Sequence, residues 1–330
     1  AGNFGSAVSK MRFHVEKGAA RMDFFDLHCD TLTRLVQTGE QLADTESCHV
    51  SLKKASAFGR WAQVYACFVP DNQNGKGAFA CYERQRDAFL GQMARWAGQV
   101  QPCADGTALA AAFAGGRRAA ILSVENGSAL EGNLSRLEVF HRDGVRFLTL
   151  TWFGENELGF GSLAGGKLKP FGREVVKKLP EYGIVPDISH LSDEGVAEVF
   201  ALTDGPLVAT HSNVRSQNGH CRNLTNAQIR EISARGGLIG LNLCRAFLSE
   251  NAASANVDDI RRHMDAFFEL GAQDALCFGT DFDGAQVPQD IGDISGVPAL
   301  YEALLKHYSQ ALLDNVFFEN AARFFTRMWP

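Results

Sequence analysis

The chain has 330 residues, of which 45% are hydrophobic and 21% are charged. This composition is typical of an ordered globular protein and excludes a largely disordered chain. The formal net charge of -6 at pH 7, with no run of Lys or Arg longer than two, argues against a nucleic-acid partner.

The sequence contains no signal for a membrane or for secretion. No stretch of about 18 apolar residues occurs, and the start of the chain lacks the apolar block of a secretory signal. We therefore predict a cytoplasmic protein without a membrane partner, and we expect residues 1–20 to be a flexible tail or an artificial addition. Eight cysteines are spread along the chain without a Cys-x-x-Cys pair, which favours reduced thiols.

Short apolar runs of strand length alternate with helical segments along the chain. The predicted strands cover residues 23–28, 63–69, 119–125, 146–151, 184–189, 207–211, 238–243 and 275–281. The predicted helices cover residues 78–96, 131–143, 172–182, 193–202, 225–235 and 257–270, and two closing helices are expected within 298–328. Eight alternations favour an α/β fold of the (β/α)₈ barrel type, one domain over residues 1–330. A doubly wound sheet is the alternative, because strand order cannot be read from one sequence.

Polar side chains follow the ends of several predicted strands. In a barrel the carboxyl ends of the strands open onto one face, so these side chains should converge. Three histidines, two aspartates and a glutamate form a mixed nitrogen and oxygen set suited to Zn²⁺. One ion does not need so many ligands, and a carboxylate between two ions can bridge them. The sequence therefore predicts a site for two divalent metal ions, built from His28, Asp30, Glu125, His190, His211 and Asp281.

Each of these residues has an ordinary explanation when taken alone. His28 and Asp30 alternate as strand residues do and would share one face, but an isolated His-x-Asp is commonly just hydrogen-bonded at a strand end. Glu125, His190 and His211 stand where charged or polar residues often precede a helix. Their shared position at the same end of the strands is what favours a site.

A resemblance to a known family is carried by the segments DLHCDTL, SVENGSAL, RFLTLTW, GIVPDISHLS, PLVATHSNVRS with HCRNLT after it, and FGTDFDG. In order and spacing they resemble the renal or membrane dipeptidase family of zinc peptidases, from about residue 23 to about residue 284. The resemblance implies that His28 and Asp30 bind one zinc ion, that His190 and His211 bind the other, and that Glu125 bridges them.

The same resemblance implies roles for two further residues. Asp281 would shuttle a proton between a metal-bridging hydroxide and the leaving amine, and it is preferred to Asp283 only because it matches the motif. Arg222 would bind the free carboxylate of the substrate, since a planar guanidinium can hold a carboxylate by two hydrogen bonds. Without the resemblance, Arg222 is equally well explained as a surface arginine before a helix cap at Asn223.

The chain departs from the family pattern in two places. Trp152 stands where many members have a histidine thought to contact the substrate carbonyl, and Asn242-Leu243-Cys244 stands where members often read Asn-Phe-Tyr. We expect Trp152 and Asn156 to contact the substrate and one of them to donate the missing hydrogen bond to the oxyanion.

The implied function is zinc-dependent hydrolysis of dipeptides, L-D dipeptides included, by a chain that forms a homodimer as the family often does. Two alternatives stay open. Another barrel amidohydrolase, acting on a cyclic amide, a phosphoester or an amino-purine, would share the metals but have no use for Arg222. A metal-binding relative that has lost catalysis would bind ligands without needing Asp281.

Overall fold

A computed structural model describes residues 21–330 of the chain. Eight parallel strands form a closed barrel, in which β1 pairs with both β2 and β9, and β2 pairs with β4. The barrel strands are β1 (Phe24–Cys29), β2 (Trp61–Phe68), β4 (Arg118–Glu125), β5 (Val145–Thr149), β6 (Val185–Asp187), β7 (Val208–Ala209), β8 (Leu238–Leu241) and β9 (Leu276–Phe278). The predicted (β/α)₈ barrel is confirmed. A short strand that was not predicted, β3 (Val100–Pro102), pairs with β4 outside the ring.

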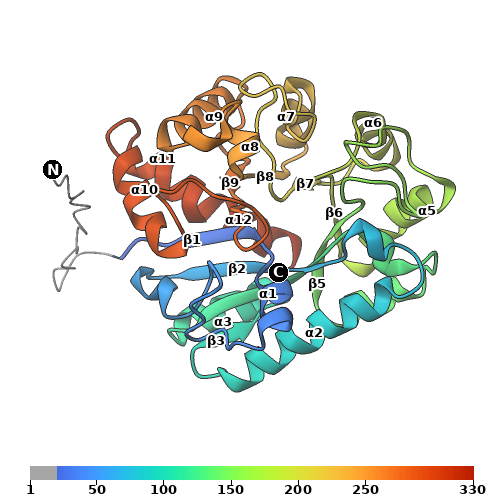
Figure 1. Ribbon diagram of the computed structural model, residues 1–330, viewed down its shortest axis with the longest axis horizontal. Helices are drawn as coiled ribbons and strands as arrows, with labels where there is room; N and C mark the ends of the chain where they lie inside the picture. The colour runs from blue at the N-terminus through green and yellow to red at the C-terminus, as the bar shows by residue number, and fades with distance from the viewer. Residues whose placement is uncertain (1–20) are drawn as a thin grey trace, which may run out of the picture.

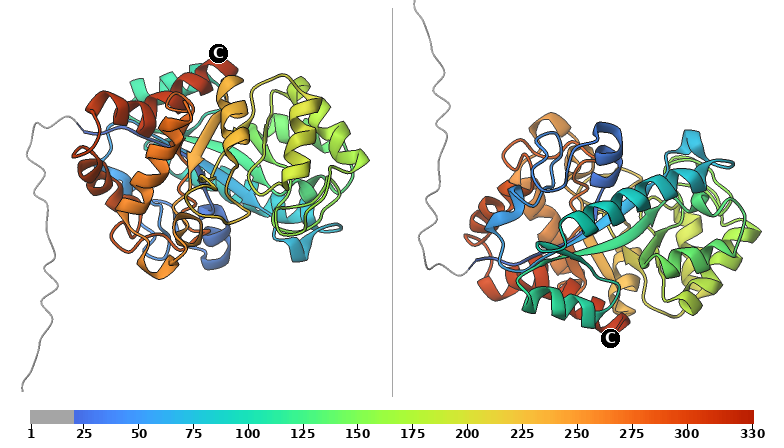
Figure 2. Two further views of the ribbon diagram at one scale, coloured as in Figure 1. Left: turned by 90° about the horizontal axis from the view of Figure 1, so that it is seen from above. Right: turned by 90° about the horizontal axis from the view of Figure 1, so that it is seen from below.

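Helices surround the strands, as Figures 1 and 2 show. They are α1 (Thr31–Thr38), α2 (Ala78–Arg95), α3 (Gly106–Ala114), α4 (Arg136–Arg142), α5 (Pro170–Lys178), α6 (Asp193–Leu202), α7 (Asn226–Ala234), α8 (Arg245–Leu248) and α9 (Val257–Glu269). Short 3₁₀ turns cover Lys54–Ala57, Asp71–Gln73, Gly127–Leu130, Leu179–Tyr182, Ala252–Ser254 and Ile294–Gly296. The six predicted helices are present.

Three of the observed helices, α1, α3 and α8, were not predicted, and one predicted helix, α4, begins at a later residue. Helix α3 reads GTALAAAFA and is almost uniformly small and apolar, so it lacks the amphipathic period by which a helix is recognised. Helices α1 and α8 are short and follow closely on strands β1 and β8. Helix α4 begins later than predicted because Glu131 and Gly132 adopt positive φ angles of 47° and 69°, which a helix does not allow.

The C-terminal segment closes the N-terminal end of the barrel. It begins with α10 (Val297–Leu304). Further along the chain, α11 (Gln310–Asp314), a π-helical turn (Asn315–Glu319) and α12 (Asn320–Met328) follow one another without a break. Phe325 and Trp329 join the same apolar cluster as the inward-facing Ile121 and Phe147. The Trp329 ring packs edge-on against Phe147 with centroids 5.5 Å apart. This end is therefore sealed by apolar side chains, and the carboxyl ends of the strands are left to form the site.

Within residues 21–330, no helix is both long and apolar enough to cross a membrane. All eight cysteines are free, and six of them are buried. The prediction for residues 1–20 lies outside the described part of the chain.

Candidate metal centre and substrate pocket

The predicted ligands lie at the carboxyl ends of the barrel strands. Glu125 is the last residue of β4, and His28 is the next to last of β1. His190, His211 and Asp281 follow β6, β7 and β9 by two or three residues. No more than 9% of the residue surface is exposed in His28, Asp30, Glu125, His190, His211 and Asp281.

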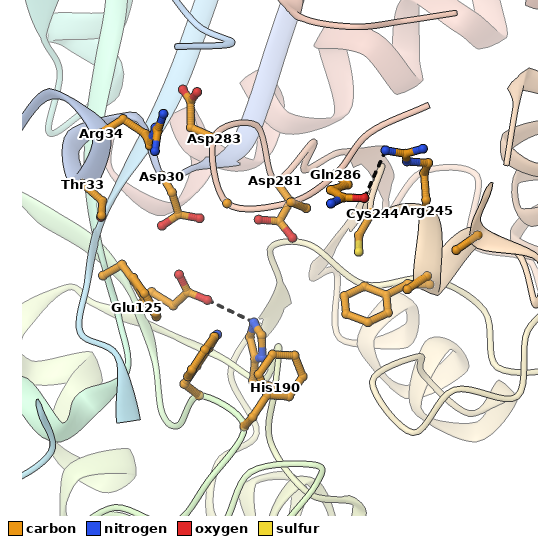
Figure 3. Close-up of a pocket in the computed structure, with 18 of the residues that line it drawn as sticks. Asp30, Thr33, Arg34, Glu125, His190, Cys244, Arg245, Asp281, Asp283 and Gln286 are labelled. Carbon is orange, nitrogen blue, oxygen red and sulfur yellow. Dashed lines mark hydrogen bonds and ion pairs between the residues drawn. The ribbon is translucent and has the colours of Figure 1, made fainter. Parts of the chain in front are cut away.

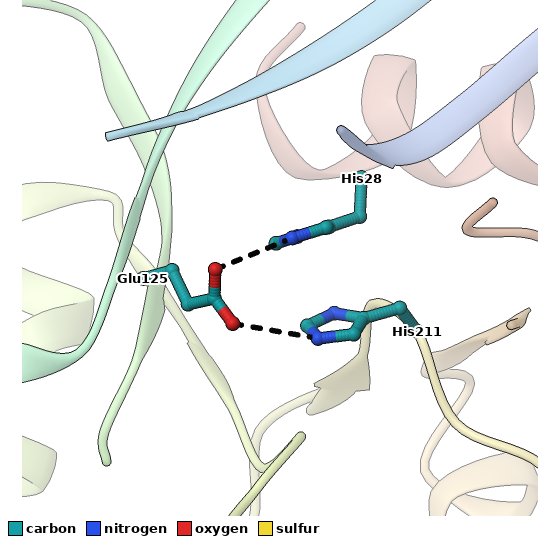
Figure 4. A group of neighbouring side chains, drawn as sticks. All are labelled: His28, Glu125 and His211. Atoms are coloured by element: carbon teal, nitrogen blue, oxygen red, sulfur yellow. Dashed lines mark ion pairs between the residues drawn. The ribbon is translucent and has the colours of Figure 1, made fainter. Parts of the chain in front are cut away.

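Glu125 places its carboxylate at the centre of the cluster. Ile121 on the same strand packs in the barrel interior, and the two-residue period of a strand carries Glu125 to the same side. Its Oε2 atom lies 3.4 Å from His28 Nε2, while Oε1 lies 3.0 Å from His190 Nε2 and 3.6 Å from His211 Nε2. Figure 4 shows His28 and His211 on the two different oxygens. With histidine nitrogens beside both of its oxygens, the Glu125 carboxylate and these rings together form a donor set for divalent metal.

A chain of hydrogen bonds orients the ring of His211. The Thr210 hydroxyl donates to Asp187 Oδ2 at 2.6 Å, so its oxygen is free to accept from His211 Nδ1, 2.8 Å away. Asp187 is fully buried and also accepts a hydrogen bond from the Thr149 hydroxyl at 2.6 Å. Because Nδ1 carries the proton, His211 Nε2 presents a lone pair toward Glu125. This is the tautomer that a metal ligand needs.

Asp30 reaches the cluster from the start of a helix and not from a strand. Strand β1 ends at Cys29, and Asp30 is the N-cap residue of α1, so strand alternation is not what brings it beside His28. Even so, Asp30 Oδ2 lies 3.5 Å from His28 Nε2. A Cβ atom at Gly284 would lie 2.0 Å from Asp30 Oδ2. The close approach of the chain at Gly284 therefore excludes a larger residue.

Asp281 and Asp283 separate in the structure, although alternation placed them on one face. Strand β9 ends at Phe278, and both aspartates adopt positive φ angles, 61° and 71°, so the strand geometry on which that prediction rested does not hold. Asp283 turns away and accepts a hydrogen bond from the Thr31 hydroxyl at 2.6 Å. Asp281 offers a ligand atom to the group formed with His28 and Asp30, in which all such atoms lie within 4.8 Å of one another.

Burial controls the protonation of the cluster. It holds the pKa values of His190 and His211 well below the ordinary value, which keeps both rings neutral, as metal ligands must be. Burial also raises the pKa of Glu125, and the Asp30 carboxylate adds to this effect. For His28, burial lowers the pKa, but the carboxylates of Glu125 and Asp30 outweigh it and the pKa lies well above the ordinary value. Carboxylates buried this closely need cations beside them to stay ionised together.

The polar atoms of the cluster fit divalent metal ions. His28 Nε2 and Asp30 Oδ1 are buried without a hydrogen-bond partner among the described residues. His190 Nε2 and His211 Nε2 lie 2.9 Å apart, and His190 is held at a φ of 69°, which is unfavourable for a residue with a side chain. Imidazole nitrogens and carboxylate oxygens crowded in this way are the donor set that zinc prefers.

Arg222 is a buried cation beside this cluster. Its Nη1 donates to Ser212 Oγ at 2.7 Å and its Nη2 donates to the His211 carbonyl at 2.8 Å, while Nε has no partner. Only 3% of its surface is exposed, so the alternative prediction of a surface arginine is wrong. Burial lowers the pKa of Arg222. Because no ion pair to a carboxylate forms within residues 21–330, the guanidinium keeps donor capacity for an anion.

A pocket of about 500 Å³ opens over the cluster. Asp30, Glu125, His190 and Asp281 contribute to its lining, as Figure 3 shows. Arg222 is not among the residues that line the pocket. Its guanidinium carbon lies 5.8 Å from the ring centre of Phe247, and Phe247 does line the pocket. The volume suits a small molecule.

Trp152 forms part of the pocket wall. Its ring packs edge-on against Phe68 and Phe153, with centroids 5.0 and 4.9 Å away. Phe153 in turn packs edge-on against the ring of His190 at 4.7 Å. The position that leaves the family pattern is therefore an aromatic wall next to a predicted metal ligand.

Asn156 does not reach the pocket, which argues against its predicted contact with the substrate. Its side-chain nitrogen donates to Asn126 Oδ1 and to the Leu150 carbonyl, both at 2.8 Å. Its side-chain oxygen accepts from the N–H groups of Leu158 and Gly159. These hydrogen bonds join the loop to Asn126, after β4, and to Leu150, after β5, so Asn156 holds the segment that carries Trp152 in place.

Several residues of the site could not be identified from the sequence. Asn242 donates to Asp281 Oδ2 at 3.0 Å and so orients it, yet the sequence marked Asn242 only as part of a departure from the family pattern. Thr210 and Asp187 lie within quoted motifs, but their hydrogen bonds to each other depend on the pairing of β6 with β7. Arg245 lines the pocket from α8, a helix of four residues that was not predicted.

Known families and solved structures that are similar to this chain include the membrane dipeptidases. The family model of the membrane dipeptidases, peptidase family M19, matches residues 15–328. A relative in Klebsiella pneumoniae, an uncharacterized protein in the pqqA 5′ region, is 30% identical over 223 residues, which are 64% of this chain and 82% of that protein.

Two solved structures are similar over almost the whole chain. One is a metallo peptidase from Rhodobacter sphaeroides liganded with a phosphinate mimic of the dipeptide L-Ala-D-Ala. It is 27% identical, has a TM-score of 0.88, and the match covers 94% of this chain and 100% of that one. The other is the dipeptidase AC, a metallo peptidase of family M19, which is 28% identical with a TM-score of 0.88 and coverages of 94% and 99%.

Proposed function

Because the chain belongs to the membrane dipeptidase family, peptidase family M19, and is a metallo-dipeptidase, we propose that it cleaves dipeptides with a free C-terminal carboxylate, using two bound zinc ions. His28 and Asp30 would hold one ion, His190 and His211 the other, and Glu125 both. Bound there, zinc would supply Lewis-acid chemistry, lowering the pKa of a water molecule and polarising the scissile carbonyl.

The observation that carries the substrate assignment is the buried charge of Arg222. A guanidinium that is 3% exposed and has no carboxylate partner within residues 21–330 is costly unless a ligand supplies the counter-charge. A terminal carboxylate can accept two parallel hydrogen bonds from such a group. Arg222 lies next to His211, so it would fix the carboxylate at one residue from the scissile bond. This position selects dipeptides over longer peptides.

Asp281 would move the proton during hydrolysis. Its Oδ2 accepts a hydrogen bond from Asn242 at 3.0 Å, and the carboxylate lines the pocket beside the ligand cluster. As water adds to the carbonyl carbon, Asp281 takes a proton from that water. It then gives the proton to the amide nitrogen as the C–N bond breaks, which releases two amino acids.

L-D dipeptides belong to the proposed substrate range. The support is the Rhodobacter sphaeroides metallo peptidase, which was crystallised with a mimic of L-Ala-D-Ala and shares the fold along 94% of this chain. Pairs of dipeptides that differ only in the configuration of the C-terminal residue would measure this preference.

The proposal is tested by comparing four substrates on the metal-loaded protein: L-Ala-L-Ala, L-Ala-D-Ala, the amide of L-Ala-L-Ala, and tri-alanine. We expect hydrolysis of the free dipeptides and little hydrolysis of the amide and the tripeptide. Equal rates on the free and amidated dipeptides would remove the role of Arg222. Hydrolysis of cyclic amides in place of all four substrates would identify another barrel amidohydrolase.

A further inference from the structure

Two arginines line the pocket and form no ion pair within residues 21–330. Arg34 comes from α1 and Arg245 from α8. They lie on opposite sides of the pocket, Arg34 near Asp30 and Arg245 near Cys244 (Figure 3). Arginine side chains at a substrate pocket without acidic partners favour anionic groups on the substrate.

Arg245 has hydrogen-bond donors to spare. Its Nη2 donates to Gln286 Oε1 at 3.1 Å, and its Nε is buried without a partner. Gln286 also lines the pocket, and its backbone carbonyl accepts from the Arg245 N–H at 2.9 Å. The arginine is therefore held at the wall by a neutral neighbour, which leaves its charge uncompensated.

Arg245 lies on the same side of the site as Arg222. The Asn223 side chain, next to Arg222 in the chain, donates to the Phe247 carbonyl at 2.9 Å, which ties the loop after β7 to helix α8. The Arg222 guanidinium lies over the Phe247 ring, two residues from Arg245. A dipeptide whose terminal carboxylate binds Arg222 therefore directs the side chain of its C-terminal residue toward this wall.

The acidic residues that line the pocket do not neutralise Arg245. Asp30 and Glu125 face the histidine cluster, and Asp281 accepts from Asn242. Asp283 is engaged with Thr31 on the side of α1.

We infer that Arg245 binds an acidic side chain on the C-terminal residue of the substrate, so that dipeptides ending in aspartate or glutamate are the preferred class. This inference rests on the proposed dipeptidase function. It names the residue that selects among dipeptides, whereas Arg222 selects dipeptides from other peptides.

The test uses matched substrate pairs on the metal-loaded full chain. Each pair replaces a C-terminal Asp by Asn or Glu by Gln after L-Ala, in both configurations of the C-terminal residue, with Ala-Ala dipeptides as the neutral reference. We expect kcat/KM to be about tenfold or more higher for the acidic member, because charge-assisted hydrogen bonds exceed neutral ones by this order. Because both members of a pair are measured on the same protein sample, the ratio of their kcat/KM values does not depend on metal loading or on the folded fraction.

Variants assign the preference to one side of the pocket. Arg245→Met should bring the acid-to-amide ratio close to one, and Arg245→Lys should keep part of it because the charge remains. Arg34→Met is the matched control and should keep the wild-type ratio. Thermal unfolding of each variant checks that the fold is retained.

Three results would overturn the inference. A ratio of one in the wild type, while Ala-Ala is cleaved, removes the acidic preference and leaves the dipeptidase function intact. If Arg34→Met loses the acid-to-amide preference and Arg245→Met keeps it, the acidic side chain of the substrate binds on the side of Arg34. If no dipeptide in the panel is cleaved, the proposed function itself fails and the inference fails with it.

Discussion

The ligand cluster and the pocket wall are neighbouring parts of one site, but they are built differently. The ligands stand at or just after strand ends, are nearly fully buried, and are oriented by hydrogen bonds such as that from His211 to Thr210. The wall residues Trp152 and Arg245 come from a loop and a short helix and are partly exposed. The barrel thus fixes the chemistry, while the loops set which substrate fits. Substitutions can therefore show whether a residue belongs to the ligand cluster or to the pocket wall.

The largest effect is expected for Glu125→Gln. Both carboxylate oxygens face histidine nitrogens, so the neutral amide would weaken both proposed ion sites at once. We expect bound metal to fall below two ions per chain and kcat/KM for dipeptides to fall on the order of 10³-fold or more. Elemental analysis and kinetics on the same sample measure both. Glu138→Gln, on an exposed part of α4, is the control and should change neither.

Arg222→Met should be almost as damaging, but only for substrates with a free carboxylate. Loss of a buried charge partner costs about 2 to 5 kcal/mol of transition-state stabilisation, which is measured as a fall in kcat/KM for dipeptides. The slow hydrolysis of an amidated dipeptide should change much less. A variant that lowers both rates by the same factor would show that Arg222 supports the structure and does not contact the substrate.

Thr210→Val tests the orientation of His211 without touching a ligand. Valine removes the hydroxyl that accepts from His211 Nδ1, so we expect metal affinity to fall about 10- to 100-fold. Thr210→Ser keeps the hydroxyl and should restore affinity. Competition with a chelator measures the affinity independently of turnover. Equal affinities in the two variants would mean that the hydrogen bond does not matter for the metal site.

Asn156→Ala should act on stability more than on chemistry. The substitution leaves the N–H groups of Leu158 and Gly159 and the Leu150 carbonyl without their buried partner. We expect a loss of about 1 to 3 kcal/mol in the free energy of unfolding, measured by denaturant titration. If stability is unchanged and kcat falls about 10²-fold, Asn156 contacts the substrate after all.

Trp152→Phe is expected to have the smallest effect. The ring serves as a wall packed on Phe68 and Phe153, and phenylalanine keeps that packing. We expect kcat to change by less than about tenfold, because loss of an oxyanion donor would cost about 10²- to 10³-fold. A fall of that larger size would assign the indole N–H to the reaction.

The ligand cluster could be predicted from the sequence because parallel strands bring their carboxyl ends together whatever the details of packing. Glu125 illustrates this, since strand alternation alone points it inward. Asp281 was less secure. The chain leaves β9 at Phe278 and turns through positive φ angles, so only the motif distinguished Asp281 from Asp283.

The wall could not be predicted because loop conformation depends on contacts between distant segments. Asn156 is turned inward by Asn126, which is 30 residues away in the chain. Arg245 stands on a helix too short to show a period, and its neighbour Gln286 comes from the loop after β9. Neither contact leaves a local pattern in the sequence.

The most direct test of the central claim is a zinc titration of the metal-stripped protein, with bound metal and turnover of L-Ala-L-Ala and L-Ala-D-Ala measured in the same samples. We expect no hydrolysis without metal and a rate that rises until about two ions are bound per chain. Full activity in protein that contains no metal would contradict this expectation, and so would protein that holds two ions but cleaves neither dipeptide.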